Sequence, residues 1–444
     1  MLRKKRRLFA APIKTANPPE DFPRLATILF EVSPLPSSIS VRLAIMMFLN
    51  FVIWGCWYVT ISTYLTSTLH FTGTEAGTVF ATAALACIIS PFFVGLIADR
   101  FFSTERVLSA LHLIGAGLLY LVTTVHSFIA VYALMFAYCL CYFPTLALTT
   151  SITLKNCPDA RRFPLFRVFG TLGWIVIGLV IGYLKVETSA TQFLLASGVS
   201  VAMGLFCLTL PHTPPMGRGN KVTARDVLGL DCLVMLKKRS YLIFAISSIL
   251  ACIPLTFYFS FTNTFLNDAG VANAAGKMTL GQASEVGMML AMPFVFRRVS
   301  VKGILLIGLA AWSLRYGLLA AGNAGPLMWM FYIAILVHGV CFDFFFVTGM
   351  LYTDQEAPPS LRNTAQGFYT FLTYGIGMFI GSELSGIAVD FFTTGTADHP
   401  VRHWTNFWLS SSASAFVLFL AIALFFGGKT LIQSKQDELV EKAA

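Results

Sequence analysis

Residues 211–238, PHTPPMGRGNKVTARDVLGLDCLVMLKK, form a long polar and basic interruption in an otherwise apolar chain. Six apolar runs precede this stretch and six follow it, and most reach the ~20 residues that a helix needs to cross the hydrocarbon of a bilayer. We therefore predict an all-α integral membrane protein with twelve transmembrane helices, arranged as two six-helix halves at 41–210 and 239–427. The expected spans lie near 41–68, 75–98, 106–125, 127–154, 163–184 and 190–210, and then near 239–266, 277–297, 301–321, 325–353, 361–391 and 402–427.

The composition indicates that lipid is the main solvent of this chain. Its 444 residues are 56% hydrophobic and 12% charged, with a mean hydropathy of +0.74. Soluble globular proteins carry about 25% charged residues, so a chain with half that fraction cannot cover its own surface with charge. The nine cysteines show neither CxxC nor zinc-ligand spacing, and we predict no metal site.

The distribution of positive charge predicts the orientation in the membrane. Lys and Arg concentrate in the predicted even-numbered loops and in both tails, whereas the odd-numbered loops hold only Lys185, Lys277 and Arg402. By the positive-inside rule, the linker and the tails at 1–40 and 428–444 are cytoplasmic. We expect a multi-pass protein of the inner cell membrane.

The net charge of +10 does not indicate a nucleic-acid partner. The basic residues lie in short loops between apolar runs, without a patch of interleaved aromatic residues. The expected partners are therefore a small solute and the lipid bilayer. The sequence has no GxSxG, P-loop or HExxH motif, so we predict a carrier rather than an enzyme, driven by an ion gradient or by the gradient of its solute.

Ionisable side chains inside the predicted spans mark candidate sites, because each costs roughly 2.5–3.5 kcal/mol at a helix centre on insertion scales. The clearest cases are Arg167, Glu285, Arg315, Asp343 and Glu383. Arg167 shares one helix face with Thr171 and Trp174, and this face offers a guanidinium, a hydroxyl and a large ring to a ring-shaped polar ligand. The alternative is an arginine that extends to the membrane interface.

The predicted eighth span holds a second polar pair. Gln282 lies one turn before Glu285 on the same face, and an amide with a carboxylate can hold vicinal hydroxyls such as those of ribose. The alternative for Glu285 is a structural bond between helices, for example to Arg315.

The predicted tenth span contains HGVCFDFFF at 338–346. Burial of Asp343 among four Phe rings penalises its charged form, so Asp343 is a candidate proton carrier unless a cation pairs with it permanently. His338 shares a face with Phe342, and three roles are open for it: proton donor, ligand contact or packed ring.

The loop after the second span carries Gly95, Asp99, Arg100 and Arg106. These residues resemble the G-x-x-x-D-R signature of the major facilitator superfamily, although Phe101 replaces the usual Gly. The resemblance implies two six-helix halves with the substrate site between them, near the middle of the membrane.

Ten short stretches resemble the nucleoside:proton symporter family of this superfamily and keep its order along the chain. They are FVIWGCW (51–57), YFPTLAL (142–148), RVFGTLG (167–173), TLPHT (209–213), LGLD (228–231), NTFL (263–266), QASE (282–285), AWSLR (311–315), GVCFDFF (339–345) and AQG (365–367). The resemblance implies a proton-coupled nucleoside importer that works by alternating access as a monomer, with the proton as coupling ion and no cofactor. It also implies that the nucleoside is surrounded by Arg167, Thr171, Gln282, Glu285, Phe342 and Asp343.

Four candidate site residues depart from the family pattern. Trp174, Thr256, Phe259 and His338 stand where the family has Phe, Gln, Asn and Tyr. Two amides that read a base edge are lost and aromatic surface is gained, so the preferred base stays open. A carrier of another solute, such as a sugar or a nucleobase, and a membrane sensor that does not transport are the alternatives. For the coupled proton, Asp343 is favoured over Glu285.

Overall fold

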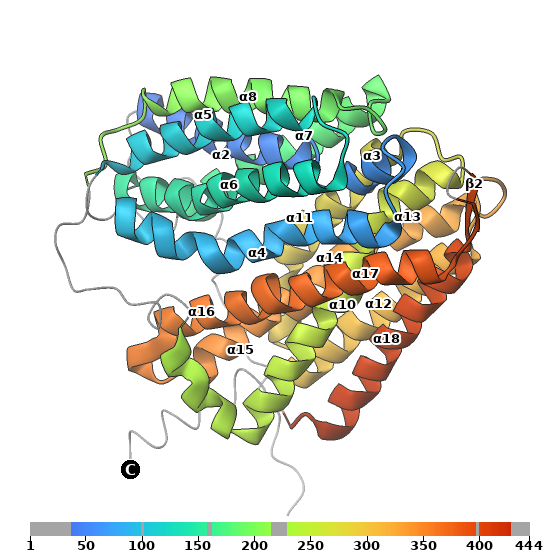
Figure 1. Ribbon diagram of the computed structural model, residues 1–444. Coiled ribbons are helices and arrows are strands. Elements are labelled where there is room, and N and C mark those ends of the chain that lie inside the picture. The colour runs from blue at the N-terminus through green and yellow to red at the C-terminus, as the bar shows by residue number, and fades with distance from the viewer. Residues whose placement is uncertain (1–36, 99–101, 158–161, 215–228, 397–398, 428–444) are drawn as a thin grey trace, which may run out of the picture.

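The computed structural model describes residues 37–98, 102–157, 162–214, 229–396 and 399–427. Most of the basic tail, the loop residues Asp99 and Arg100, half of the linker and the C-terminal tail lie outside these residues. The described residues are almost entirely helical and gather in two groups (Figure 1). We refer to α2 to α8 as the N-terminal half and to α10 to α18 as the C-terminal half.

The helices of the N-terminal half follow the apolar runs, but the first span is interrupted. They are α2 (Ser37–Gly55), α3 (Ile61–Ser67), α4 (Gly73–Ala98), α5 (Thr104–Val122), α6 (Phe128–Asn156), α7 (Phe163–Leu184) and α8 (Thr191–Cys207). Between α2 and α3, backbone hydrogen bonds with three- and four-residue spacing alternate. Within this interruption Thr60 Oγ1 donates to Gln192 Oε1 at 2.6 Å, which ties the irregular turn to α8.

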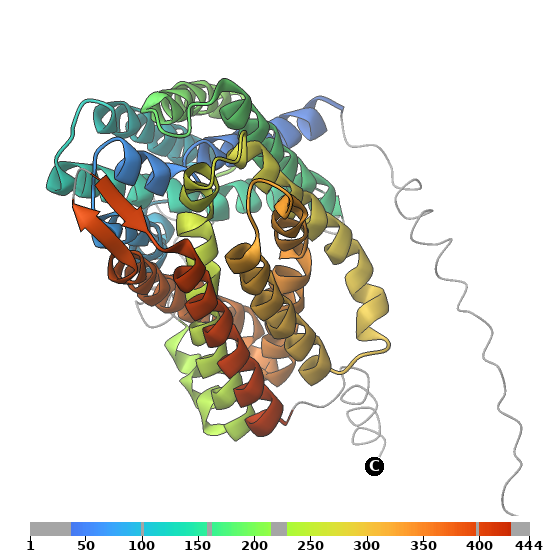
Figure 2. The same ribbon diagram turned by 90° about the vertical axis from the view of Figure 1, so that its right-hand side faces the viewer.

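A short 3₁₀ helix, η2, precedes the C-terminal half, and several spans of that half are divided. In chain order, these elements are η2 (Leu230–Lys237), α10 (Arg239–Asp268), α11 (Ala274–Phe296), α12 (Val301–Ala321), α13 (Met328–Leu336), α14 (His338–Phe342), η3 (Asp343–Val347), α15 (Thr348–Glu356), η4 (Pro359–Leu361), α16 (Arg362–Thr370), η5 (Phe371–Gly377), α17 (Met378–Phe391), β1 (Thr393–Thr396), β2 (His399–Arg402) and α18 (Trp404–Phe425). The two strands pair antiparallel as a small hairpin. We call the end of the molecule that carries it the hairpin end, which Figure 2 views face on.

Two spans of the C-terminal half contain π-helical turns. In the tenth span η3 (Asp343–Val347) joins α14 to α15, and in the eleventh η5 (Phe371–Gly377) joins α16 to α17. A π turn takes one residue more than an α turn and is common at functional sites. Each of these turns therefore changes which side chains of its span face a given neighbour.

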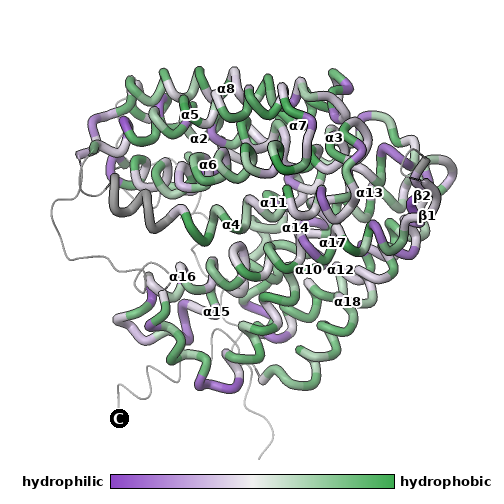
Figure 3. The backbone as a smooth tube through the Cα atoms, in the orientation of Figure 1, coloured by the Kyte–Doolittle hydropathy of each residue, from purple (hydrophilic) through white to green (hydrophobic). Residues whose placement is uncertain are grey.

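The helices have the length and composition of membrane spans, which confirms the predicted all-α membrane fold. In the described part of the chain, ten helices are long and apolar enough to cross a bilayer. The 17-residue α8 is shorter, and α11 carries polar residues that include Gln282 and Glu285. Figure 3 shows hydrophobic residues along most of the helices.

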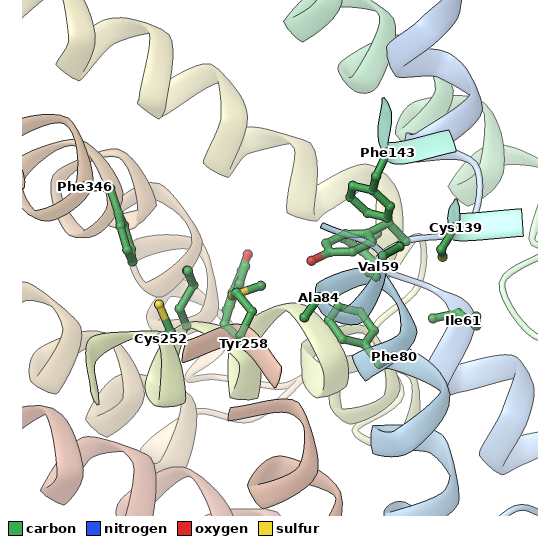
Figure 4. Close-up of a cluster of buried hydrophobic side chains, with 14 of the residues drawn as sticks. Val59, Ile61, Phe80, Ala84, Cys139, Phe143, Cys252, Tyr258 and Phe346 are labelled. Carbon is green, nitrogen blue, oxygen red and sulfur yellow. The ribbon is translucent and has the colours of Figure 1, made fainter. Parts of the chain in front are cut away.

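A continuous apolar core runs through both halves. Figure 4 shows part of it, with Phe80 and Phe143 from the N-terminal half and Cys252 and Tyr258 on α10. Many hydrophobic side chains are exposed on the surface as well, among them Leu290 and Phe391.

At the hairpin end the two halves meet through polar side chains. Glu187, which follows α7, is buried and accepts hydrogen bonds from Asn263 (3.0 Å), Asn267 (2.5 Å) and the backbone N–H of Ala275 (2.8 Å). Beside it, Thr63 Oγ1 donates to Asn263 Oδ1 at 2.7 Å. The N-terminal half is thereby fastened to α10 and to the first turn of α11.

A second set of contacts joins α4 to α17. Asp390 accepts hydrogen bonds from the backbone N–H groups of Gly73 (2.6 Å) and Thr74 (2.7 Å), at the first turn of α4. The two helices touch closely, since a Cβ on Gly77 would lie 2.6 Å from the carbonyl oxygen of Ser382. Two faces of the N-terminal half therefore meet the C-terminal half at this end.

Candidate substrate cavity

A cavity lies between the two halves. Its volume is about 310 Å³, at the lower end of the range for small-molecule sites. Its lining comes from both halves and consists of Phe51, Trp54, Tyr58, Arg167, Thr171, Trp174, Phe259, Gln282, Glu285, Met289, Phe342, Val347, Met350, Tyr374 and Met378.

The α7 wall of the cavity presents Arg167, Thr171 and Trp174 together, as their helical spacing predicts. The Arg167 guanidinium carbon lies 4.2 Å from the centroid of the Phe51 ring, a cation–π contact that orients it. Next to Trp174, a Cβ on Gly173 would lie 2.4 Å from the carbonyl oxygen of Phe48 in α2. The close approach of α7 to α2 therefore sets the position of this wall.

The α11 wall presents Gln282, Glu285 and Met289 on one helix face. Glu285 keeps 24% of its side-chain surface exposed, so its carboxylate is accessible from the cavity. The neighbouring Ser284 donates its hydroxyl hydrogen bond to the carbonyl of Leu336. This bond holds α11 against the tenth span, directly beside Glu285.

The charged side chains of the described lining are Arg167 and Glu285, one from each half. The remainder is mainly aromatic and thioether surface. Among the described residues, no group of three His, Cys, Asp or Glu side chains lies close enough to hold a metal ion. Such a lining suits an uncharged ligand with a flat ring and several hydroxyl groups.

Aromatic rings from both halves surround the site. Trp174 meets Trp54 edge-on, with ring centroids 5.1 Å apart. Phe259 and Phe342 enter from the C-terminal half, and the ring of Phe259 lies 5.7 Å from that of Tyr58. These rings give a planar ligand several possible stacking partners.

Three of the ten predicted contact residues lie behind the cavity wall. His338 and Asp343 are 1% and 0% exposed, and neither belongs to the lining. Thr256 is also fully buried, and its hydroxyl donates to the carbonyl oxygens of Cys252 (3.0 Å) and Ile253 (2.8 Å) in its own helix. The structure therefore brings together Arg167, Thr171, Trp174, Phe259, Gln282, Glu285 and Phe342.

Within the part of the chain that the structure describes, Asp343 has no hydrogen-bond partner for either carboxylate oxygen, and Arg315 has none for Nε and Nη2. Both side chains are completely buried. The partner of Arg315 is His338, whose Nδ1 lies 2.9 Å from Nη1. The structure thus does not pair Arg315 with a carboxylate, in contrast to the structural bond considered for Glu285.

Several lining residues were not among the predicted contacts. Phe51, Trp54 and Tyr58 come from the first span, and Tyr58 lies in the interruption between α2 and α3. The concentration of aromatic residues in this span is the signal in the sequence that points to them. Met289 extends the face of Glu285 by one turn. Val347 and Tyr374 lie in π-helical turns, which α-helical spacing does not anticipate.

Comparison with known proteins identifies the family. The model of the nucleoside H+ symporter family matches residues 37–430. The chain belongs to this family. As a family member it is a membrane transporter, and the family match supports coupling to protons.

Individual relatives in the nucleoside H+ symporter family match this chain over most of their length. The chain is 37% identical to the putative nucleoside transporter YegT of Escherichia coli, with 87% of this chain and 93% of the relative covered. It is 34% identical to the xanthosine permease of the same organism, with 88% and 96% covered.

Solved structures of membrane transporters have the same fold as this chain. The crystal structure of the nucleoside transporter NupG has a TM-score of 0.81 at 30% identity and covers 88% of this chain and 100% of that chain. An inward-facing bacterial homologue of the human lysosomal transporter Spinster has a TM-score of 0.68 at 15% identity, with 89% and 97% covered. The fold is that of the major facilitator superfamily.

Proposed function

We propose that this chain imports nucleosides together with protons, by alternating access of the cavity to the two sides of the membrane. The observation that carries this proposal is a single cavity to which the N-terminal half contributes Arg167 and Thr171 and the C-terminal half contributes Gln282 and Glu285. A ligand held by both halves couples their relative movement to its own binding.

Each part of a nucleoside has a matching surface in the cavity. The Gln282 amide exchanges hydrogen bonds with the ribose hydroxyls, the Glu285 carboxylate accepts hydrogen bonds from them, and Trp174 and Phe342 pack on the base. Arg167 and Thr171 supply further polar contacts. Phe259 takes a place where an amide would read the base edge, so stacking contributes more of the affinity than base-specific hydrogen bonds.

Asp343 is the proposed proton carrier. A buried carboxylate without any hydrogen-bond partner is strongly disfavoured, and both oxygens of Asp343 lack one. The conformation described here therefore suits the neutral acid. Release of the proton requires a conformation in which water or a cation reaches this side chain, and that requirement links protonation to the transport cycle. Glu285, at the cavity surface, is the second candidate.

The proposed orientation places the hairpin end outside the cell. The helices alternate in direction, so basic residues such as Lys155, Lys238, Arg298 and Arg362 lie in connections or at helix ends on the opposite side of the molecule. Those connections and both termini are then cytoplasmic in the inner membrane. With the halves fastened at the hairpin end, the conformation is inward-facing. One chain contains the whole cavity, so we propose a monomer as the transporting unit.

The test is uptake of labelled uridine and adenosine into proteoliposomes, with and without an inward acid gradient. Acid-stimulated accumulation of either nucleoside is the expected result. Competition by unlabelled ribose, glucose and uracil is measured in parallel. In α10, Thr256 and Phe259 replace the two amides of the family pattern, and this replacement favours a sugar or a nucleobase as the alternative solute. Flux of ribose or uracil in preference to nucleosides would contradict the proposed substrate class. Binding of a nucleoside without flux would contradict the proposed transport activity.

A further inference from the structure

Behind the α11 wall lies a buried row of polar side chains that leads from the cavity into the C-terminal half. Arg315 on α12 is 0% exposed and His338 on α14 is 1% exposed. Arg315 Nη1 lies 2.9 Å from His338 Nδ1, and His338 Nε2 lies 3.9 Å from Glu285 Oε2. Glu285 is the only one of the three in the described cavity lining.

The His338 ring has little freedom to move. Tyr258 stacks on it, with centroids 5.4 Å apart and ring planes 24° apart, and the Arg315 guanidinium carbon lies over the Tyr258 ring, 3.3 Å from its centroid. Phe259 meets the ring edge-on at 5.6 Å. On α11, a Cβ on Gly281 would lie 3.2 Å from the Cβ of His338, so the two helices touch at this point.

The hydrogen bond from Arg315 determines which His338 nitrogen carries the proton. A guanidinium can only donate hydrogen bonds, so Nδ1 must be the unprotonated acceptor. In a neutral imidazole the proton is then on Nε2, the nitrogen that faces Glu285. An imidazolium would set two N–H donors against each other and add a second positive charge beside Arg315 in a low-dielectric interior.

We propose that Arg315 and His338 are a positioning pair for the ribose site. Arg315 holds His338 neutral with its Nε2–H directed at Glu285, and this donor holds one carboxylate oxygen so that the other faces the cavity. At 3.9 Å the Nε2–Oε2 contact is longer than a hydrogen bond, and a small rotation of the Glu285 side chain closes it when a ligand binds. His338 is accordingly a fixed donor and not the coupled proton's carrier.

This inference rests on the proposed function, because it assigns His338 to recognition of the sugar. Its consequence is selectivity: a carboxylate held by His338 accepts both vicinal hydroxyls of ribose, whereas a free carboxylate turns and loses this geometry. Transport should therefore distinguish uridine from 2′,3′-dideoxyuridine by about tenfold or more in KM, the value of one or two hydrogen bonds to a charged group.

The experiment compares two substitutions of the same residue. His338→Gln keeps an acceptor for Arg315 and a donor for Glu285, whereas His338→Leu fills similar space with neither. The quantity measured is the ratio of the KM for 2′,3′-dideoxyuridine to the KM for uridine. His338→Gln should retain most of the wild-type ratio, whereas His338→Leu should bring the two KM values together. Retention of the wild-type ratio by His338→Leu would overturn the proposal.

Two further measurements separate positioning from a general loss of structure. In a Glu285→Gln background, His338→Leu should change the ratio no further, because the two residues act through one interaction. An independent additional effect would contradict this coupling. The matched control is His112→Leu on α5, since His112 is also a buried histidine, 2% exposed, but lies in the other half. This control should leave the KM ratio unchanged.

The tautomer can be read without any substitution that threatens folding. In ¹⁵N-histidine-labelled wild-type protein, the signal that disappears in His338→Gln should be that of a neutral ring protonated at Nε2. An imidazolium or a ring protonated at Nδ1 would overturn the proposal. Failure of the wild-type protein to take up either nucleoside would instead overturn the proposed function, and the nitrogen spectrum would still decide the state of His338.

Discussion

Glu187 and Asp390 make equivalent contacts on opposite halves. Glu187 follows the fifth span and accepts the N–H of Ala275 in the first turn of the eighth span. Asp390 ends the eleventh span and accepts the N–H groups of Gly73 and Thr74 in the first turn of the second. The eleventh and eighth spans are the fifth and second of the C-terminal half. Each half therefore places a carboxylate on the positive end of a helix dipole in the other.

We predict that removal of these two charges opens the hairpin end. A capping carboxylate contributes about 1 kcal/mol, and the Glu187→Gln/Asp390→Asn double variant weakens both contacts. Spin labels on the exposed positions Ser67 and Ala272, one in each half, should then show a larger population of long distances. A distance distribution equal to that of the unsubstituted protein would refute the role of the two carboxylates. The nine native cysteines are all buried or half-buried, which limits background labelling.

We predict that Gly386→Ala blocks the approach of α17 to α4. A Cβ at this position would lie 2.4 Å from the carbonyl oxygen of Gly73, and overpacking of this kind costs about 1–3 kcal/mol. Uptake should fall roughly tenfold because the closed hairpin end becomes less populated. The matched control is Gly198→Ala on α8, where an added Cβ meets nothing within 4 Å. Equal uptake rates for the two variants would contradict the prediction.

We predict that Asp343→Asn uncouples transport from the proton gradient. The amide cannot release a proton, so acid-driven accumulation should cease while nucleoside exchange across the membrane continues. Asp268→Asn is the control, because Asp268 accepts hydrogen bonds from Arg402 and Trp404 at 2.9 Å near the hairpin end, away from the cavity. Accumulation by Asp343→Asn at the wild-type level would remove Asp343 from the coupling role.

We predict that Trp174→Ala weakens nucleoside affinity for every base. Stacking of a base on an aromatic ring is worth about 1–3 kcal/mol, so KM should rise roughly five- to a hundredfold, and Trp174→Phe should restore much of the loss. Trp329→Ala, at a half-exposed tryptophan on α13, should leave KM unchanged. An increase in KM for one base alone would show that Trp174 reads base identity instead.

The sequence predicted the walls of the site wherever regular helical spacing defines a face. Arg167, Thr171 and Trp174 share such a face, as do Gln282 and Glu285, and all five line the cavity. In these helices no irregular turn intervenes, so the period of 3.6 residues carries from the sequence into the structure. Their contact with a ligand remains a prediction.

The tenth span shows why other positions could not be assigned from spacing. Phe342 lines the cavity and the adjacent Asp343 does not, since neighbours on a helix point about 100° apart and the π turn begins at Asp343. His338 is one turn before Phe342, yet Phe259 and Phe342 cover it. Which of several aligned residues reaches the cavity depends on what the neighbouring helices place in front of it, and this information is absent from the periodicity of one helix.

The π-helical turns η3 and η5 each place one residue of the cavity lining, Val347 and Tyr374, in a turn that is wider than an α turn. The extra residue of such a turn offsets the two parts of its span by about 100° around the helix axis. We infer that a change between π and α geometry at either turn would rotate one part of the span against the other and move Val347 or Tyr374 relative to a bound solute. A change of this kind is confined to one helix, and it differs from a rigid-body movement of the two halves.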